Sequence, residues 1–263
     1  MNQKEGRFTG WHVVVTGAGT GIGRAIALRL AGEGAKLTLL ARNPARLDEV
    51  AQEIRKLGGA ETTSAPLDIQ DRLAVDARFA EAAAKLGPIR ALVANAGVGG
   101  GNSPGARDRF DEIIATNLTG TYSCLRAAER HLAKGPEARH LVVIASILGR
   151  IGVAGYTGYC TSKAGLLGLV RALAMELAPS NVQVNAVCPG WVETAMAREG
   201  LESMAKGMGT SVEKAREAAM AEVPLGRMNV PEDVAGCVAW LLSRDARGVT
   251  GQGIDMNGGG WMG

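Results

Sequence analysis

Three residues in the second half of the chain have the types and spacing needed for proton transfer. Tyr159 and Lys163 are four positions apart, and Ser146 lies thirteen residues before Tyr159. On a helix, side chains four positions apart share one face. A free tyrosine has a pKa of about 10 and is a poor base at neutral pH, so we expect the Lys163 cation to lower that pKa by stabilising the phenolate. Ser146 would hold a substrate oxygen while Tyr159 gives or takes its proton.

A glycine-rich segment, Thr16–Gly23, follows one expected strand and opens one expected helix. Glycines at such a turn let the backbone approach a pyrophosphate, and the helix N-terminus offers it unpaired N–H groups and partial positive charge. A strand before the motif and a helix after it are the context that a dinucleotide site requires. The residues of this turn that we predict to bind a dinucleotide are Gly17, Gly19, Thr20, Gly21, Ile22 and Gly23.

Arg42 lies nineteen residues after Gly23, at the end of the expected second strand. NAD-binding proteins usually carry an acidic residue there for the ribose hydroxyls, whereas an arginine can pair with a 2′-phosphate. NADP(H) is therefore favoured over NAD(H). The alternative is a solvated arginine that leads into the next helix, and Thr20 supplies no second cation inside the glycine turn.

The elements that must position these residues follow from the hydrophobic pattern. Short β-branched or leucine-rich runs alternate with longer alanine-rich segments, as is typical of βαβ units with a parallel sheet. We predict one α/β domain over residues 1–263, built on a Rossmann-like, doubly wound parallel sheet of about seven strands flanked by helices. The expected strands are His12–Thr16, Lys36–Leu40, Ile89–Ala94, His140–Ala145 and Val182–Val187, with Glu61–Pro66 and Gly253–Met256 as weaker candidates.

One long segment, Trp191–Ala221, separates a strand-like run from a helix expected near Pro231 and is rich in Met, Gly, Lys and Glu. Long insertions in compact domains are usually functional. We predict that about residues 191–222 form a lid over the substrate. The alternative is a pair of surface helices that only packs.

The composition is that of a globular chain with a sizeable core. Of 263 residues, 46% are hydrophobic and 21% charged, and the formal net charge of +3 includes no polybasic run. We therefore expect neither a nucleic-acid nor a membrane partner, and no apolar stretch reaches the roughly 18 residues of a membrane span. The cysteines are far apart and form no C-x-x-C pair, so we expect reduced thiols, no metal and a cytoplasmic location. They are Cys124, Cys160, Cys188 and Cys237.

Taken together, these motifs resemble the short-chain dehydrogenase/reductase family over essentially the whole chain. The resemblance rests on the glycine turn, Asp68, Asn95-Ala96-Gly97, Asn117, Ser146, Tyr159 with Lys163, and Pro189-Gly190 followed by Thr194. It implies a catalytic tetrad of Asn117, Ser146, Tyr159 and Lys163, with a water held at Asn117 that links Lys163 to solvent. It also implies that Lys163 contacts the nicotinamide ribose and that Asp68 meets the adenine. The further cofactor-binding residues that it implies are Ile69, Asn95, Ala96, Gly97, Tyr159, Pro189, Gly190, Val192 and Thr194.

The resemblance further implies an oxidoreductase that interconverts a ketone and a secondary alcohol by hydride transfer, with proton exchange through Tyr159. Reduction is the expected direction if NADPH is the cofactor. We expect a small-molecule ketone or alcohol as substrate, and the family resemblance implies a homotetramer. Two alternatives stay open, an NAD-dependent dehydrogenase of a secondary alcohol or 3-hydroxyacyl compound and, more remotely, a non-catalytic dinucleotide-binding regulator.

Two branches of the family are similar in the Cys188–Trp191 run and in the length of the lid, the 3-hydroxybutyrate dehydrogenases and the polyketide or 3-oxoacyl-carrier-protein ketoreductases. The hydroxybutyrate enzymes bind a carboxylate with Gln, His and Lys where this chain has Gly99, Leu148 and Tyr156. A buried carboxylate needs paired donors, so the ketoreductase branch is favoured. We expect an apolar cyclic, aromatic or acyl-chain ketone. The candidate substrate residues are Gly99, Ile147, Leu148, Val153, Tyr156 and Trp191. Among them, Ile147, Leu148, Val153 and Tyr156 could equally pack in the core.

Overall fold

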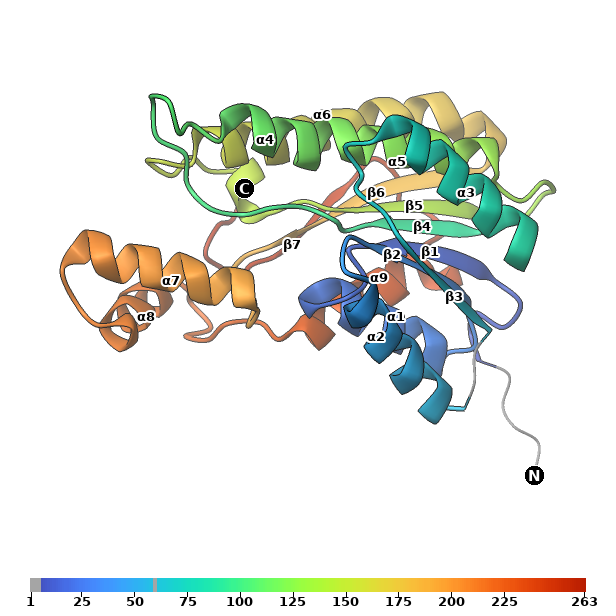
Figure 1. Cartoon of the computed structure of the whole chain (residues 1–263), viewed down its shortest axis with the longest axis horizontal. Coiled ribbons are helices and arrows are strands. Elements are labelled where there is room, and N and C mark those ends of the chain that lie inside the picture. The colour runs from blue at the N-terminus through green and yellow to red at the C-terminus, as the bar shows by residue number, and fades with distance from the viewer. Residues whose placement is uncertain (1–5, 59–60) are drawn as a thin grey trace.

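The computed structural model describes residues 6–58 and 61–263, and a seven-stranded parallel sheet runs through this part of the chain (Figure 1). The strand order is β3-β2-β1-β4-β5-β6-β7. The predicted doubly wound, Rossmann-like α/β sheet is confirmed. The strands are β1 (His12–Thr16), β2 (Lys36–Ala41), β3 (Thr62–Pro66), β4 (Ala91–Ala94), β5 (Arg139–Ile144), β6 (Val182–Pro189) and β7 (Gly253–Met256).

The expected strands agree with the observed ones within two residues at each end. Two ends differ by two residues: β4 begins only at Ala91, because Ile89 pairs with Leu132 in an isolated bridge, and β6 continues to Pro189. The hydrophobic runs were informative because strands covered on both faces need apolar side chains on both.

Helices cover both faces of the sheet (Figure 1). One layer holds α1 (Gly21–Gly32), α2 (Pro44–Lys56) and α9 (Pro231–Leu241), and the other holds α3 (Arg72–Leu86), α5 (Thr121–Arg130) and α6 (Thr157–Leu177). Alternate residues of one strand therefore enter different cores. Val13 and Val15 pack with the α1 side, whereas Val14 packs with the α5 and α6 side, and all three are fully buried.

The strand order reverses between β1 and β4, because β2 follows β1 on one side and β4 lies on its other side. In open parallel sheets, ligands bind beyond the carboxyl ends of the strands at such a switch point. The chain after β4 leads through α4 (Phe110–Ile114) and a π-helical turn, η1 (Ala115–Gly120), into α5. The described part of the chain also contains the short 3₁₀ turns η2 (Ile147–Gly149), η3 (Ala178–Ser180) and η4 (Arg244–Ala246).

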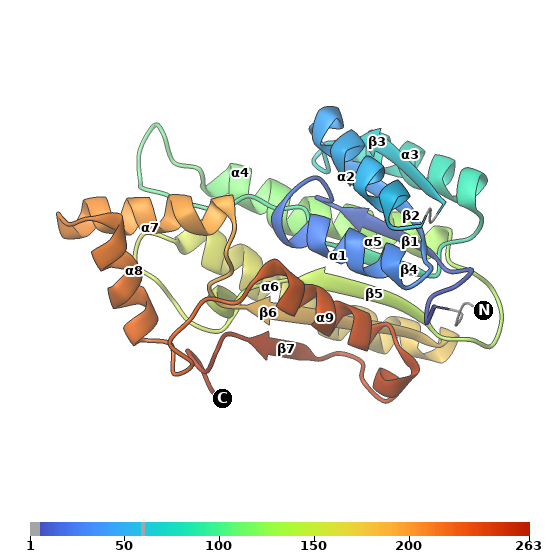
Figure 2. The ribbon, with the colours of Figure 1, turned by 90° about the horizontal axis from the view of Figure 1, so that it is seen from below.

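The predicted insertion after β6 forms two helices, α7 (Ala195–Met208) and α8 (Val212–Ala221), that extend away from the sheet (Figures 1 and 2). Thr194 caps α7 by accepting a hydrogen bond from Ala197 N, and Ser211 caps α8. Leu201 of α7, Ala219 of α8 and Met228 form a separate small core, against which Trp191 packs.

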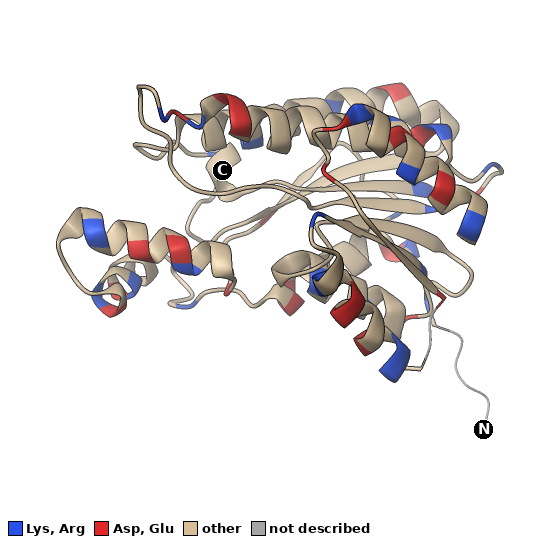
Figure 3. Cartoon of the chain, viewed as in Figure 1, with Lys and Arg blue, Asp and Glu red and all other residues tan. Residues whose placement is uncertain are grey.

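Acidic and basic residues are mixed along the helices (Figure 3). Several form pairs three residues apart along one helix, such as Arg78 with Glu81 and Arg126 with Glu129. None of the helices in the described part of the chain is both long and apolar enough to span a membrane.

Candidate active site

The glycine turn between β1 and α1 presents backbone rather than side chains. Gly17 and Gly21 have φ of 65° and 51°, in the left-handed region that favours glycine. Gly23 is required for packing, because a Cβ there would collide with the Gly17 carbonyl and lie 2.5 Å from the Asn95 amide nitrogen. Thr20, the N-cap of α1, makes no side-chain cap, so the N–H groups of the first turn stay available to an anion.

Asn95, the first residue after β4, holds this turn in place. Its Nδ2 donates to the carbonyl oxygens of Thr16 and Gly17, each at 3.1 Å. Thr16 Oγ1 in return accepts from the backbone N–H groups of Asn95 and Ala96. This predicted cofactor residue therefore ties β1 to β4 at the switch point and fixes the shape of the glycine turn.

A cavity of about 1130 Å³ opens at the switch point, between the glycine turn and the α7–α8 pair. Gly23, which was also predicted to bind the cofactor, does not line the cavity and packs closely against Gly17. The predicted cofactor residues that line the cavity are Gly17, Gly19, Thr20, Gly21, Ile22, Arg42, Asp68, Ile69, Asn95, Ala96, Gly97 and Thr194. Asp68 Oδ1 accepts a hydrogen bond from Gln70 N at 3.0 Å, which orients the carboxylate.

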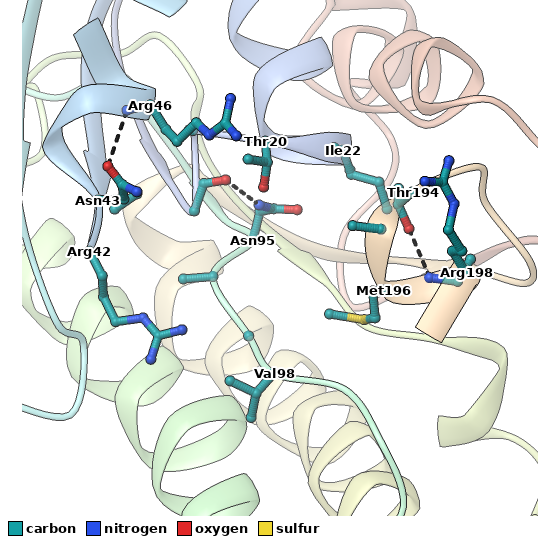
Figure 4. Close-up of a pocket in the computed structure, with 18 of the residues that line it drawn as sticks. Thr20, Ile22, Arg42, Asn43, Arg46, Asn95, Val98, Thr194, Met196 and Arg198 are labelled. Carbon is teal, nitrogen blue, oxygen red and sulfur yellow. Dashed lines mark hydrogen bonds between the residues drawn. The ribbon is translucent and has the colours of Figure 1, made fainter. Parts of the chain in front are cut away.

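Two arginines line one end of the cavity, and sequence reasoning missed the second. Arg42 follows β2, and Arg46 lies in the first turn of α2 (Figure 4). Asn43 sets the position of Arg46 by accepting a hydrogen bond from its backbone N–H at 3.3 Å. The glycine turn itself holds no cation, as expected, and the helix after β2 supplies one. The sequence feature that could have identified Arg46 is its position four residues after Arg42.

The opposite wall comes from the segment after β6, and Figure 4 shows Thr194, Met196 and Arg198 across from Arg42 and Arg46. Sequence reasoning missed Met196 and Arg198, as well as Glu193 and Arg216, which form an ion pair with 2.6 Å between Glu193 Oε1 and Arg216 Nη2. Composition had marked the segment, but only the fold shows which of its side chains line the cavity.

Tyr159 and Lys163 lie one turn apart near the start of α6, as their spacing predicted. Lys163 Nζ lies 5.5 Å from the centroid of the Tyr159 ring and donates to the Ile144 carbonyl at 2.9 Å. Lys163 does not itself line the cavity, but its Nζ lies close to the cavity-lining Gly97, where a Cβ would be 3.9 Å from it.

Burial sets the protonation of this pair. Burial raises the pKa of Tyr159 to about 12, and the hydrogen bond with Ser146 opposes part of that rise. Burial lowers the pKa of Lys163 to about 8, with Cys188 acting in the opposite direction. At neutral pH Tyr159 is therefore a phenol and Lys163 mostly an ammonium. The predicted net lowering of the Tyr159 pKa is wrong for this arrangement, because burial outweighs every effect that stabilises the phenolate.

Ser146 and Asn117 complete the predicted tetrad. Ser146 is the N-cap of η2, where its Oγ accepts from Leu148 N at 3.1 Å and its hydroxyl also forms the hydrogen bond with Tyr159. Asn117 lies in the π-helical turn, a form that is frequent at functional sites. Its Oδ1 accepts from Val98 N, and its Nδ2 donates to the Val98 carbonyl and to Ser162 Oγ. The side chain thus joins the loop after β4 to α6.

Comparison with known proteins identifies the family. The family model described as enoyl-(acyl carrier protein) reductase matches residues 17–260. A protein of Streptomyces virginiae, named as a ketoacyl reductase of the monensin polyketide synthase, is 37% identical over 252 residues, 94% of this chain and 95% of the relative. The chain belongs to the short-chain dehydrogenase/reductase family. It is an oxidoreductase that acts between C=O and CH–OH groups with a nicotinamide cofactor.

Solved structures share the fold of this short-chain dehydrogenase/reductase over its length. A variant of actinorhodin polyketide ketoreductase with NADPH is 35% identical, with a TM-score of 0.88 over 96% of this chain and 98% of that chain. NAD⁺-bound xylitol dehydrogenase is 30% identical, with a TM-score of 0.89 over 96% of this chain and 100% of that chain. Because one structure holds NADPH and the other NAD⁺, the shared fold does not choose between the cofactors.

The remaining predicted cofactor residues of the enzyme lie where β6 ends. Pro189 is the last residue of β6, and Gly190 N donates to the Met256 carbonyl at 3.0 Å. Val192 is buried and forms an isolated bridge with Asn229. These contacts give the chain a fixed path from the sheet to Thr194.

The predicted substrate residues lie outside the lining of this cavity. Ile147 and Leu148 follow Ser146 in η2, and Ile147 Cδ1 would lie 3.7 Å from a Cβ on Gly260. Tyr156 is the N-cap of α6, whereas Val153 is 40% exposed.

Gly99 and Trp191 belong to the contacts of the α7–α8 pair. A Cβ on Gly99 would lie 2.7 Å from Met196 Cγ, so this glycine lets Met196 reach the loop after β4. The Trp191 ring packs on α7, where it would lie 3.4 Å from a Cβ on Gly200. Trp191 is thus part of the small core of the pair, and its contact with substrate stays a prediction.

Proposed function

We propose that the enzyme uses NADPH to reduce a ketone to a secondary alcohol. The observation that carries the proposal is the Tyr159 phenol, whose pKa is raised to about 12, beside Ser146 and one turn from Lys163. A group protonated at neutral pH is a proton donor, and a carbonyl oxygen needs a proton during reduction. Oxidation of an alcohol would first require Tyr159 to lose its proton, so the resting protonation state of Tyr159 is the one that reduction needs.

NADPH is the proposed cofactor because Arg42 and Arg46 line the same end of the cavity. The planar guanidinium pairs with a phosphate through parallel hydrogen bonds, which suits the 2′-phosphate of NADPH. The glycine turn and the open first turn of α1 fit the pyrophosphate. We also propose Asp68 and Ile69 for the adenine side, Lys163 for the nicotinamide ribose, and Pro189, Gly190, Val192 and Thr194 for the carboxamide side.

The chemistry divides between the cofactor and the chain. A bound nicotinamide supplies the hydride that the carbonyl carbon accepts. Ser146 and Tyr159 donate hydrogen bonds to the carbonyl oxygen and stabilise the negative charge that develops there. Tyr159 then gives its proton to that oxygen, so that ketone, hydride and proton make the secondary alcohol. Lys163 stabilises the resulting phenolate, and Asn117 is proposed to extend the path by which a proton returns from solvent.

We propose that residues 191–222 act as a lid on one domain formed by the whole chain, 1–263. Support comes from α7 and α8, which line the cavity, and from the approach of Met196 to Gly99. A lid that excludes water strengthens the electrostatic interactions inside the site.

An apolar cyclic, aromatic or acyl-chain ketone is the proposed substrate. The candidate residues Ile147, Leu148 and Val153 are apolar, and a small keto acid would need paired donors for its carboxylate. Similarity to proteins named as polyketide ketoreductases supports this class. We further propose a cytoplasmic homotetramer, for which the free thiols fit a reducing compartment and the oligomer rests on family resemblance.

The test is a substrate panel assayed with NADPH and NADH separately. The panel contains 1-tetralone, cyclohexanone, ethyl acetoacetate and acetoacetate, with secondary alcohols and NAD⁺ for the reverse reaction. We expect NADPH-dependent reduction of 1-tetralone or ethyl acetoacetate and little reduction of acetoacetate. Turnover of alcohols with NAD⁺ alone would favour the dehydrogenase alternative. Nucleotide binding without any turnover would favour the regulator.

A further inference from the structure

Asn102 is the centre of a hydrogen-bond cluster beside the active site, in the loop of residues 97–109. The residue is 8% exposed. Its Oδ1 accepts from Gly158 N at 2.8 Å and from Thr157 Oγ1 at 3.1 Å. Its Nδ2 donates to Thr157 Oγ1 at 2.9 Å and to Asp108 Oδ1 at 3.0 Å. Both ends of this nearly buried amide therefore have protein partners.

These partners begin two helices that lead to the predicted tetrad. Gly158 N is a first-turn donor of α6, whose own N-cap, Tyr156, provides no side-chain cap. Asn102 satisfies that donor from a separate segment, in the way that an N-cap side chain normally does. Asp108 Oδ1 also accepts from the backbone N–H of Phe110, the first residue of α4. One amide thus joins the starts of α4 and α6.

The close approach of the loop to α6 depends on two glycines. A Cβ on Gly101 would lie 2.8 Å from the Gly155 carbonyl, and one on Gly158 would lie 3.3 Å from Asn102 Oδ1. In addition, Asn102 N donates to the Gly155 carbonyl at 2.8 Å. The contact is therefore made by closely packed backbone, which leaves the amide little freedom to move.

A second asparagine repeats this link one turn further along α6. Asn117 Nδ2 donates to Ser162 Oγ at 3.2 Å, and the Ser162 hydroxyl donates to the Tyr159 carbonyl at 2.8 Å. The loop of residues 97–109 is thus held to α6 at Gly158 through Asn102. It is held at Ser162 through Asn117, which also binds the backbone of Val98. Tyr159 lies between these two points.

We propose that Asn102 is a positioning residue that sets the place of Tyr159 relative to Ser146 and Asn117. The proposal rests on the proposed function, because it assigns a purpose to the proton of Tyr159. A reacting group displaced by about 1 Å can lower a rate by about 100-fold. Asn102 lies outside the lining of the cofactor cavity, so its loss should affect turnover and leave cofactor binding unchanged.

The first test compares Asn102→Ala with Asp71→Ala, a matched change at another helix start. Asp71 caps α3 by accepting from Ala74 N at 3.0 Å, and α3 carries none of the predicted site residues. With 1-tetralone and NADPH, well below the melting temperatures of both variants, we expect Asn102→Ala to lower kcat and kcat/KM together, by about 10-fold to 100-fold. NADPH affinity, measured by fluorescence, should stay the same. Wild-type kcat in Asn102→Ala, or an equal loss in Asp71→Ala, would overturn the proposal.

The second test reverses the polarity of the cluster. Asn102→Asp keeps an acceptor for Gly158 N but places a carboxylate against Asp108, so we expect kcat to fall. Adding Asp108→Asn restores a donor between the two side chains, and kcat should return to within about threefold of wild type if the two residues act as one unit. A double variant as slow as Asn102→Asp would mean that this hydrogen bond does not position Tyr159.

The third test needs no substrate. Deuterium uptake by a peptide covering residues 156–163 should be faster in Asn102→Ala than in wild type and unchanged in Asp71→Ala, because the first turn of α6 opens more often without its cap. Unchanged deuterium uptake in Asn102→Ala contradicts the proposal, whatever value of kcat the first test gives. If wild type reduces none of the ketones, the proposed function fails, and faster uptake still supports the placement of Tyr159 by Asn102.

Discussion

Lys163 combines a functional position with a cost to stability. It is 6% exposed, and its Nζ donates to a neutral acceptor, the Ile144 carbonyl. Burial lowers its pKa to about 8, which means that the folded protein disfavours the ammonium. Buried charges are expensive even when they are hydrogen-bonded, and active sites commonly retain such groups. The cost should therefore be measurable once the function is removed.

We predict that Lys163→Met abolishes reduction and raises the free energy of unfolding at pH 7 by on the order of 2 kcal/mol. The lysine has the lower pKa in the folded state, so the unfolded chain binds more protons between about pH 8 and its ordinary pKa. Wild-type stability therefore rises with pH in this range relative to the variant. The excess free energy of unfolding of Lys163→Met over wild type should therefore be largest below pH 8 and shrink above it. Urea unfolding at pH 7, 8, 9 and 10 measures this, with the exposed Lys85→Met as control, and a gain that does not vary with pH would refute the argument.

Tyr159→Phe tests the proton donor itself. Without the hydroxyl, no group stands in its place beside Ser146, so kcat should fall by about 100-fold to 10,000-fold, the usual contribution of a general acid. NADPH affinity should change little, because the ring remains. Tyr122→Phe, on α5, is the matched control and should keep full activity. Substantial turnover by Tyr159→Phe would show that another group protonates the substrate.

At the residue scale, spacing predicted which side chains meet but not their environment. Tyr159 and Lys163 were found from a local repeat, since four positions make one helical turn. The direction of the Tyr159 pKa shift was missed because burial depends on chain segments that spacing does not describe. Asn102 was missed for a related reason, because its partner Thr157 lies 55 positions away and only the fold brings the two together.

At the element scale, the α7–α8 pair differs from the rest of the molecule in how it is held. The sheet helices pack on two extensive cores, whereas the pair has a small buried core of Leu201, Ala219 and Met228. Segments with few buried apolar contacts open more readily, which suits an element that moves over a substrate. The sequence analysis gave a helix pair as one alternative for this segment, but the bounds of the two helices and the cap at Ser211 came only with the structure.

Shortening this pair tests its role. We predict that replacing residues 204–216 by two glycines leaves NADPH affinity within about tenfold of wild type, because the glycine turn, Arg42 and Arg46 remain. The same change should lower kcat by about 100-fold, because water is no longer excluded and the substrate is less well aligned. Stopped-flow reduction and fluorescence titration measure the two effects. Glu193→Gln is the control, because it removes only an exposed ion pair with Arg216 and should have a small effect. A shortened enzyme with normal kcat would exclude the lid.

At the scale of the whole molecule, cofactor binding and folding share the same contacts. Asn95 connects β1 to β4, and Gly23 packs α1 against the turn that lines the cavity. The sequence was informative here because a parallel α/β sheet places its strand ends at one edge, so motifs at strand ends must meet. Which side chains beyond Thr194 line the facing wall could not be inferred, because the path after β6 depends on long-range contacts such as that of Gly190 with Met256.

This coupling predicts a thermal shift that depends on the cofactor. A ligand that binds only the folded state at about 100 times its Kd adds about 2.7 kcal/mol to the free energy of unfolding. For a chain of this size, that raises Tm by about 5–10 °C. NADH at the same concentration should give a smaller shift, because it lacks the 2′-phosphate that Arg42 and Arg46 would bind. Arg42→Asp should remove most of the difference, whereas Arg78→Asp, on α3, should preserve it. If NADPH shifts Arg42→Asp and wild type equally, the 2′-phosphate does not bind at Arg42 and the cofactor preference must be revised.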